Sequence, residues 1–157
     1  MKPSILATGL MSMVALGFSH AASGQLIDAT DPFSIMKLIQ KDGYQARLET
    51  DSTGDPMITG RLGSANWSMY FYGCENNRDC NSVSLSSGFD LADGLSLESA
   101  NAFNYEWRWA SVELDEENDP FLRMDINLIY GVSEDNFRDS FDTWRIVLEK
   151  FVTFIDW

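Results

Sequence analysis

Histidine is almost missing from this sequence: among its 157 residues the only one is His20, close to the N-terminus. We expect that segment to be removed, which leaves no histidine for a nucleophilic triad or for a histidine-ligated metal site. The sequence also lacks the glycine-rich loop that cradles phosphate and the Gly-x-Ser-x-Gly elbow of hydrolases. We therefore predict that the protein is not an enzyme and has no catalytic, cofactor-binding or metal-binding residues.

Basic residues are scarce as well. The chain has 11 Lys and Arg against 24 Asp and Glu, a formal net charge of −13. Nucleic acids and anionic membranes attract basic surfaces, so this balance argues against both as partners, whereas it would favour a basic partner. Most carboxylates fall in turns or at helix starts, where they are usually solvated. A glycosidase pair among them, or calcium in the turns at 51–55 and 115–119, is a weaker alternative, because neither turn has the EF-hand order of ligands.

A long apolar run occurs only once, at the N-terminus. Lys2 precedes the apolar run Ile5–Phe18. The small residues Ser19 and Ala21 then stand at the two positions before a cleavage site that signal peptidase recognises. The run is too short for a membrane span, which needs about 20 apolar residues. A buried N-terminal helix is the alternative, but helix caps are missing. We predict a signal peptide at residues 1–21, a single soluble domain at 22–157 without membrane insertion after cleavage, and a periplasmic or secreted location.

Cysteine occurs only twice, as Cys74 and Cys80, with five polar residues between them. In an exported protein such a pair is by default a disulfide, here one that closes a short loop. A redox-active pair is the alternative, but the spacing is not the two-residue spacing of thiol oxidoreductases. Zinc is disfavoured because two cysteines without histidine do not complete a site.

The hydrophobic pattern predicts three helices and six strands. The first helix is capped by Asp31 and ends at Gly43, the second is capped by Ser96 and runs to about Tyr105, and the third is capped by Ser133. The predicted strands are Tyr44–Glu49, Met57–Leu62, Asn66–Gly73, Asn81–Phe89, Trp107–Leu114 and Phe121–Tyr130. The order α-β-β-β-β-α-β-β-α predicts an α+β fold, an antiparallel sheet with one face covered by helices.

The third helix carries the strongest periodic signal. Its apolar residues recur at alternating spacings of four and three, which is typical of a long amphipathic helix packed on a core: Phe137, Phe141, Trp144, Leu148, Phe151 and Ile155.

Alternation along the strands divides the sheet residues into two sets. The set expected to face the helices is Leu48, Ile58, Leu62, Trp67, Met69, Phe71, Val83, Leu85, Val112, Leu114, Leu122, Met124, Ile126 and Leu128. The set expected on the other face is Arg47, Arg61, Tyr70, Tyr72, Trp107, Trp109, Arg123, Asp125 and Asn127. Tyr, Trp and Arg dominate protein interfaces, so the Tyr, Trp and Arg of this set are candidate partner-binding residues. The alternative is that the aromatic residues pack under the second helix or a loop.

Several short stretches resemble the YbjN family of bacterial proteins, often labelled sensory transduction regulators, and in particular exported members with a cysteine pair. The similar stretches are Gly43-Tyr44-Gln45-Ala46, the turn from Asp51 to Pro56, Phe71-Tyr72-Gly73-Cys74, Asn101-Ala102-Phe103-Asn104, and Met124 to Leu128 followed by Gly131-Val132. The resemblance spans about residues 30 to 155. It implies a fold similar to that of type III secretion chaperones, which are α+β modules that bind protein segments.

Two classes of function remain open at this point. We expect an exported, non-enzymatic binding or chaperone-like regulatory module that acts on a protein partner. The alternative is a periplasmic small-ligand carrier or an enzyme inhibitor on the same fold. A deep apolar cavity would favour the carrier, and a flat open face would favour the protein partner. The sequence names no partner and leaves a homodimer open.

Overall fold

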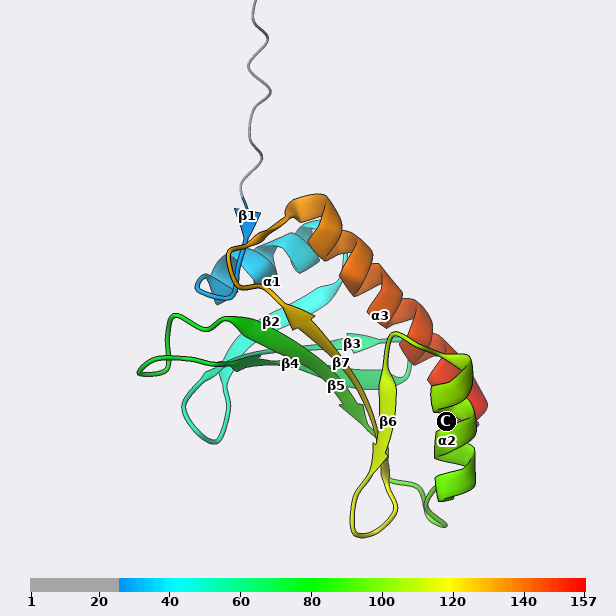
Figure 1. Ribbon diagram of the computed structural model, residues 1–157. Helices are drawn as coiled ribbons and strands as arrows, with labels where there is room; N and C mark the ends of the chain where they lie inside the picture. Colours follow the sequence, from blue (N-terminus) through cyan, green and yellow to red (C-terminus); the bar gives the residue numbers. More distant parts are fainter. Residues whose placement is uncertain (1–25) are drawn as a thin grey trace, which may run out of the picture.

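The computed structural model describes residues 26–157, which form three helices and two sheets (Figure 1). The helices are α1 (Pro32–Lys41), α2 (Leu97–Glu106) and α3 (Glu134–Phe154). The large sheet contains β2 (Gln45–Thr50), β3 (Pro56–Leu62), β4 (Ala65–Tyr72), β5 (Ser82–Gly88), β6 (Ser111–Leu114) and β7 (Pro120–Asn127). Its strands lie in the order β2-β3-β4-β5-β7-β6, and all neighbours are antiparallel. The predicted α+β class and the order of these nine elements are confirmed.

A second, two-stranded sheet was not predicted. It pairs β1 (Leu26–Ile27) with β8 (Val132–Ser133). Two-residue strands have no periodicity that could reveal them in a sequence. The predicted signal peptide, residues 1–21, lies outside the described residues.

The helices begin where polar side chains can cap them. The carboxylate of Asp31 accepts a hydrogen bond from the backbone N–H of Ser34 at 3.0 Å. Hydrogen bonds from the hydroxyl and N–H of Ser34 lower the pKa of Asp31 below its ordinary value of 3.8. At α3, the hydroxyl of Ser133 accepts from the N–H of Asn136 at 3.1 Å. The predicted caps of α1 and α3 are therefore the observed ones.

The core lies between one face of the large sheet and the three helices, which stand on the same side of it (Figure 1). The ring of Trp67 in β4 meets Phe141 of α3 edge-on, with centroids 5.4 Å apart. Phe103 of α2 meets Phe151 of α3 at 4.8 Å, so α2 packs against α3 at the β6 end of the sheet. Trp144, at the middle of the α3 stripe, is completely buried.

The predicted inward-facing set is almost entirely buried, with Leu48 and Leu114 as the exceptions. Leu48 is 38% exposed because β2 is an edge strand whose outer flank has no neighbouring strand. Leu114 is half-buried in the edge strand β6, just before a turn. In α2, Leu97 is 77% exposed, because the buried face of this short helix is formed by Ala100 and Phe103.

Amide side chains cover parts of both outer edges of the large sheet. Asn104 of α2 bonds both backbone groups of Val112 in β6: its Oδ1 accepts from the N–H at 2.7 Å, and its Nδ2 donates to the carbonyl at 3.1 Å. Gln40 of α1 donates through Nε2 to the carbonyl of Ala46 in β2 at 2.8 Å. Unpaired strand edges are templates for pairing with other chains, so these contacts protect the edges where they occur.

The last two strands of the large sheet are shorter than predicted. β6 begins at Ser111 rather than Trp107, because the N–H of Trp107 bonds to the carbonyl of Phe103 and ends α2 there. β7 ends at Asn127, whose side-chain oxygen accepts from the N–H of Ile129 and turns the chain.

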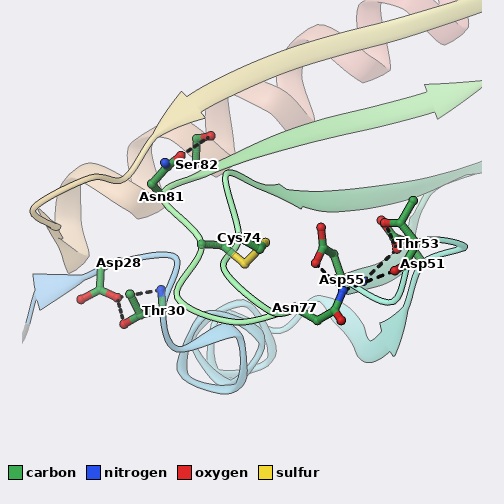
Figure 2. The surroundings of a disulfide bond; sticks show 10 residues. Asp28, Thr30, Asp51, Thr53, Asp55, Cys74, Asn77, Asn81 and Ser82 are labelled. Atoms are coloured by element: carbon green, nitrogen blue, oxygen red, sulfur yellow. Dashed lines mark hydrogen bonds between the residues drawn. A yellow bond between two sulfur atoms is a disulfide. The ribbon is translucent and has the colours of Figure 1, made fainter.

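A disulfide joins Cys74 and Cys80 and closes the loop between β4 and β5 (Figure 2). From the middle of this loop, Asn77 reaches the β2–β3 turn. Its Nδ2 donates to the carboxylate of Asp55 at 2.8 Å and to the carbonyl of Thr53 at 3.3 Å (Figure 2). The disulfide loop therefore holds a turn that lies more than 20 residues away in the sequence.

Candidate functional site

The face of the large sheet opposite the helices is the candidate site, because in residues 26–157 no helix packs on it (Figure 1). The central strand β5 contributes small serines to this face, Ser82, Ser84 and Ser86, through the alternation of side chains along a strand. The register places Tyr70 on one side of Ser84 and Asp125 on the other. Because these serines are smaller than the side chains beside them on β4 and β7, the open face has a hollow along β5.

Ser84 is the most buried of these three serines, with only 6% of its surface exposed, although no helix covers it. The hydroxyl of Ser82 bonds to Asn81, and that of Ser87 bonds to the carbonyl of Asn66. By contrast, no residue in 26–157 hydrogen-bonds the hydroxyl of Ser84. Ser84 also lines the hollow.

A groove of about 930 Å³ runs over β5 and β7 toward the start of β6, and we call it the β7 groove. The exposed side chains around it include two aromatic residues, Tyr72 (48% exposed) and Trp109 (57% exposed), and Ile129 (45% exposed). Its main polar side chains are those of Ser82, Ser84, Arg108, Ser111, Glu113, Arg123, Asp125 and Asn127. The lining therefore mixes aromatic, apolar and charged groups, the mixture found at protein interfaces.

Two contacts fix the cationic side chains of the β7 groove. The guanidinium Nε of Arg123 lies 3.1 Å from a carboxylate oxygen of Glu113 on the neighbouring strand. The guanidinium carbon of Arg108 lies 4.6 Å from the centroid of the Trp109 ring, a cation–π arrangement. Asp125 has no such partner: none of the ion pairs in the described part of the chain includes its carboxylate.

The structure divides the predicted binding residues into separate groups. Tyr72, Trp109 and Arg123 come together in the β7 groove. Arg47 and Arg61 lie at the other end of the same face, along a second groove of about 730 Å³ over β2 and β3. The half-buried Tyr70 lies beside the β2–β3 turn, next to Tyr72.

Trp107 is not on the open face, which corrects the prediction. Its ring stacks on Phe103 of α2, with centroids 6.2 Å apart, and packs against the core. The strand that was expected to turn Trp107 outward starts only at Ser111. The alternative, that an aromatic residue packs under the second helix, describes Trp107 correctly.

Sequence reasoning missed Arg108, Ile129 and the serines of β5 as lining residues. The serines could have been found, because Ser82, Ser84 and Ser86 alternate with Val83 and Leu85 in a predicted strand. Arg108 and Ile129 lie in connections outside strands, where no periodicity indicates which way a side chain points.

In the two acidic turns, at 51–55 and 115–119, the first carboxylate accepts hydrogen bonds from groups of its own turn. The carboxylate of Asp51 accepts from the hydroxyl and N–H of Thr53, both at 2.8 Å, and these bonds, led by the hydroxyl, lower the pKa of Asp51 below its ordinary 3.8. Asp115 accepts in the same way from the N–H groups of Glu117 and Asp119.

Residues 26–157 contain no group of three or more His, Cys, Asp or Glu placed to hold a metal. In the same part of the chain, no helix is long and apolar enough to span a membrane.

Comparison with known proteins agrees with this architecture. The YbjN family model, described as "Putative bacterial sensory transduction regulator", matches residues 32–157. The crystal structure of YbjN from E. coli, described as "a putative transcription regulator", superposes with a TM-score of 0.54 at 16% identity, covering 78% of this chain and 91% of that one. That likeness concerns the fold alone. No curated protein sequence gives a significant match. Because the family model spans most of the chain, the chain belongs to the YbjN family.

Proposed function

We propose that this protein is an exported, non-enzymatic regulatory module that binds a protein partner through the open face of its large sheet. The observation that carries the proposal is the β7 groove, in which Tyr72, Trp109 and Arg123 come together on an uncovered face. Exposed aromatic side chains beside arginine are the residues that contribute most to protein interfaces. The description of the family as a regulator supports the same class of role.

The shape of the site favours a protein over a small ligand. A small-ligand carrier needs a concave pocket that encloses most of its ligand. The β7 groove instead lies open on the surface, and its lining is partly polar. The space between helices and sheet is filled by side chains such as Trp67, Phe103 and Trp144. A partner with a basic surface would suit a chain with net charge −13.

The location belongs to the same proposal. The apolar run before Ser19 has the form of a signal peptide, and a disulfide such as Cys74–Cys80 persists in oxidising compartments. Together they favour a periplasmic or secreted protein. The partner would then be met outside the cytoplasm.

Site-specific photo-crosslinking in the host tests this proposal. A photoreactive phenylalanine analogue at Tyr72 would lie in the β7 groove and should crosslink to a discrete partner. The same analogue at Tyr105 is the matched control, because Tyr105 is 93% exposed but lies on α2, away from the groove. Equal crosslinking from both positions, or none from Tyr72, would contradict the assignment of the open face.

The chemistry of recognition is tested by a charge change in the groove. Arg123→Ala should weaken capture of the crosslinked partner, because it removes the guanidinium that lies beside Glu113 and lines the groove with Tyr72 and Trp109. Lys150→Ala is the control, since it makes the same change of net charge on exposed α3, outside the groove. If both variants lose the partner equally, only the overall charge matters, and the groove is not the binding site.

A further inference from the structure

The β7 strand has an edge that its neighbour covers only in part. β6 pairs with β7 from Pro120 to Arg123 and starts at Ser111, opposite Arg123. β7 itself continues to Asn127. Residues Met124–Asn127 therefore have β5 on one side and no strand on the other, over a length of about 13 Å.

The hydrogen-bond pattern tells which backbone groups face this edge. The carbonyl of Pro120 accepts from the N–H of Phe89, and the N–H of Leu128 donates to the carbonyl of Asn81, so the even-numbered residues of β7 bond toward β5. In an antiparallel strand the bonding direction alternates, so the N–H and C=O of Asp125 and Asn127 point the other way. No backbone or side-chain group within residues 26–157 bonds to these four groups.

On each of the two outer strands of the large sheet, a side chain bonds to the outward-facing backbone of one residue. Asn104 bonds to both backbone groups of Val112 on β6, and Gln40 bonds to the carbonyl of Ala46 on β2. Edges are commonly protected in this way because they otherwise pair with other chains. The edge at Asp125 and Asn127 has no such cover and opens into the β7 groove, facing the segment Arg108–Ala110 on the opposite wall.

We propose that the edge of β7 at residues 124–127 binds an extended segment of a partner protein as an added antiparallel strand, with a basic side chain opposite Asp125. This inference rests on the proposed function and names how the groove would hold its partner. A row of alternating donors and acceptors recognises extended backbone rather than a helix. A strand that continued the line of β6 would run antiparallel to β7.

The charges at this edge favour a basic side chain in the partner segment and disfavour a second copy of this chain as the partner. Asp125 is exposed and lacks an ion pair among the described residues, so a Lys or Arg directly across from it gains a favourable cross-strand pair. A second copy of this chain would bring a further net charge of −13 to the same edge. A basic extended segment therefore fits better than a homodimer.

A backbone-modified peptide gives the direct test on the purified full-length chain. The probe is a capped tetrapeptide of sequence Thr, Val, Lys, Val, which spans Asn127 to Met124 and stops short of Ser111, titrated while the amide signals of Asp125 and Asn127 are followed by NMR. In the antiparallel register with Lys opposite Asp125, the Lys N–H pairs and the neighbouring Val N–H groups point away. Methylation of the Lys amide should weaken binding about tenfold, since it removes a donor and blocks close approach, whereas methylation of a Val amide should change it far less. Equal effects of the two methylations would overturn the proposal.

Two variants distinguish the contribution of the Asp125 backbone N–H to peptide binding from that of the Asp125 carboxylate. Asp125→Pro removes the carboxylate and also the N–H that faces the groove, so it should bind the peptide about tenfold more weakly than Asp125→Ala does. Asp125→Ala keeps that N–H but should abolish the preference for Lys over Glu in the peptide, which we expect to be about two- to fivefold in the parent. If Asp125→Pro does not fold, the methylated peptides still decide the question.

The same variants distinguish this inference from the proposed function. If Asp125→Pro binds the partner crosslinked at Tyr72 as tightly as the parent does, strand addition is wrong and the open face remains the binding site. If the parent captures no partner, the proposed function fails, and the peptide titration still tests the edge. If the parent is a dimer, Asp125→Pro is a monomer and no peptide binds, the edge serves a second copy and the proposed occupant is wrong.

Discussion

Gly60 lies against the indole of Trp67, its partner on the neighbouring strand. A Cβ atom on Gly60 would lie 2.4 Å from Cζ2 of that indole and 2.2 Å from the carbonyl oxygen of Gln45. Trp67 is buried and in turn packs on Phe141 of α3. The absence of a side chain at Gly60 is thus what allows Trp67, the largest residue of β4, to pack against β3 beneath α3.

Gly60→Ala should therefore destabilise the domain by about 1–3 kcal/mol, the usual cost of overpacking a core. Thr59→Ala, one residue earlier on the open face, is the matched control and should cost about 0.5 kcal/mol. Urea denaturation of both variants measures the difference. Equal free energies of unfolding would show that Trp67 can move aside and that the close approach is not required.

The sequence was most informative where periodicity extends over a whole element. The stripe on α3, from Phe137 to Phe151, predicted a core helix, and its members are buried. Alternation also placed Tyr72 and Arg123 on the open face, because β4 and β7 alternate over eight residues each. Both the fold class and the position of the groove on the sheet follow from such local regularity.

The parts that sequence reasoning missed depend on contacts between distant segments. Trp107 was misplaced because the end of α2 and the bond of Asn104 to Val112 decide where β6 begins. The open edge of β7 exists only because β6 starts as late as Ser111. Neither contact leaves a periodic signal, so the strand boundary and the shape of the groove required the structure.

Replacing both cysteines by serine should lower the free energy of unfolding by about 2 kcal/mol without unfolding the domain, because the bond closes a short loop. Mass spectrometry of the unreduced protein should find no alkylatable thiol at Cys74 or Cys80. Asn77→Ala is the matched control within the loop: it keeps the disulfide but removes the bond to Asp55, and should cost about 1 kcal/mol. Two reactive thiols in freshly exported protein would contradict the assignment.

Stability should fall in acid partly through Asp31 and Asp51, whose pKa values are lowered by hydrogen bonds in the folded state. A lowered pKa means that the ionised form stabilises the fold. This contribution is complete above the ordinary pKa of 3.8 and is lost as the pH falls through the lower folded-state pKa. Asp31→Asn keeps a good helix cap but removes one of the two groups. Urea denaturation at pH 7 and pH 3 should show a smaller acid loss for this variant than for the parent, and an equal loss would refute the role of Asp31.

The mature protein should begin at Ala22, or within a residue or two of it. The reason is the pair of small residues Ser19 and Ala21 at the end of the apolar run. Intact-mass measurement of protein from the host's exported fraction checks this, and a species that retains Met1 would contradict it. Ala21→Tyr should block or shift the cleavage, because it places a large side chain at a position where signal peptidase recognises small ones.

Trp144→Ala tests whether α3 is a core helix rather than an interface. Trp144 is completely buried, and the stripe to which it belongs packs between the sheet and α2. Removing a large buried aromatic side chain costs about 3–5 kcal/mol, a large share of the total stability of a small domain. Thermal melting should therefore show a strongly destabilised or unfolded variant. Thr153→Ala, on the exposed side of the same helix, is the control and should melt close to the parent. A Trp144→Ala protein that melts like the parent but loses its partner would make α3 an interface, and the assignment of its apolar stripe to the core would be wrong.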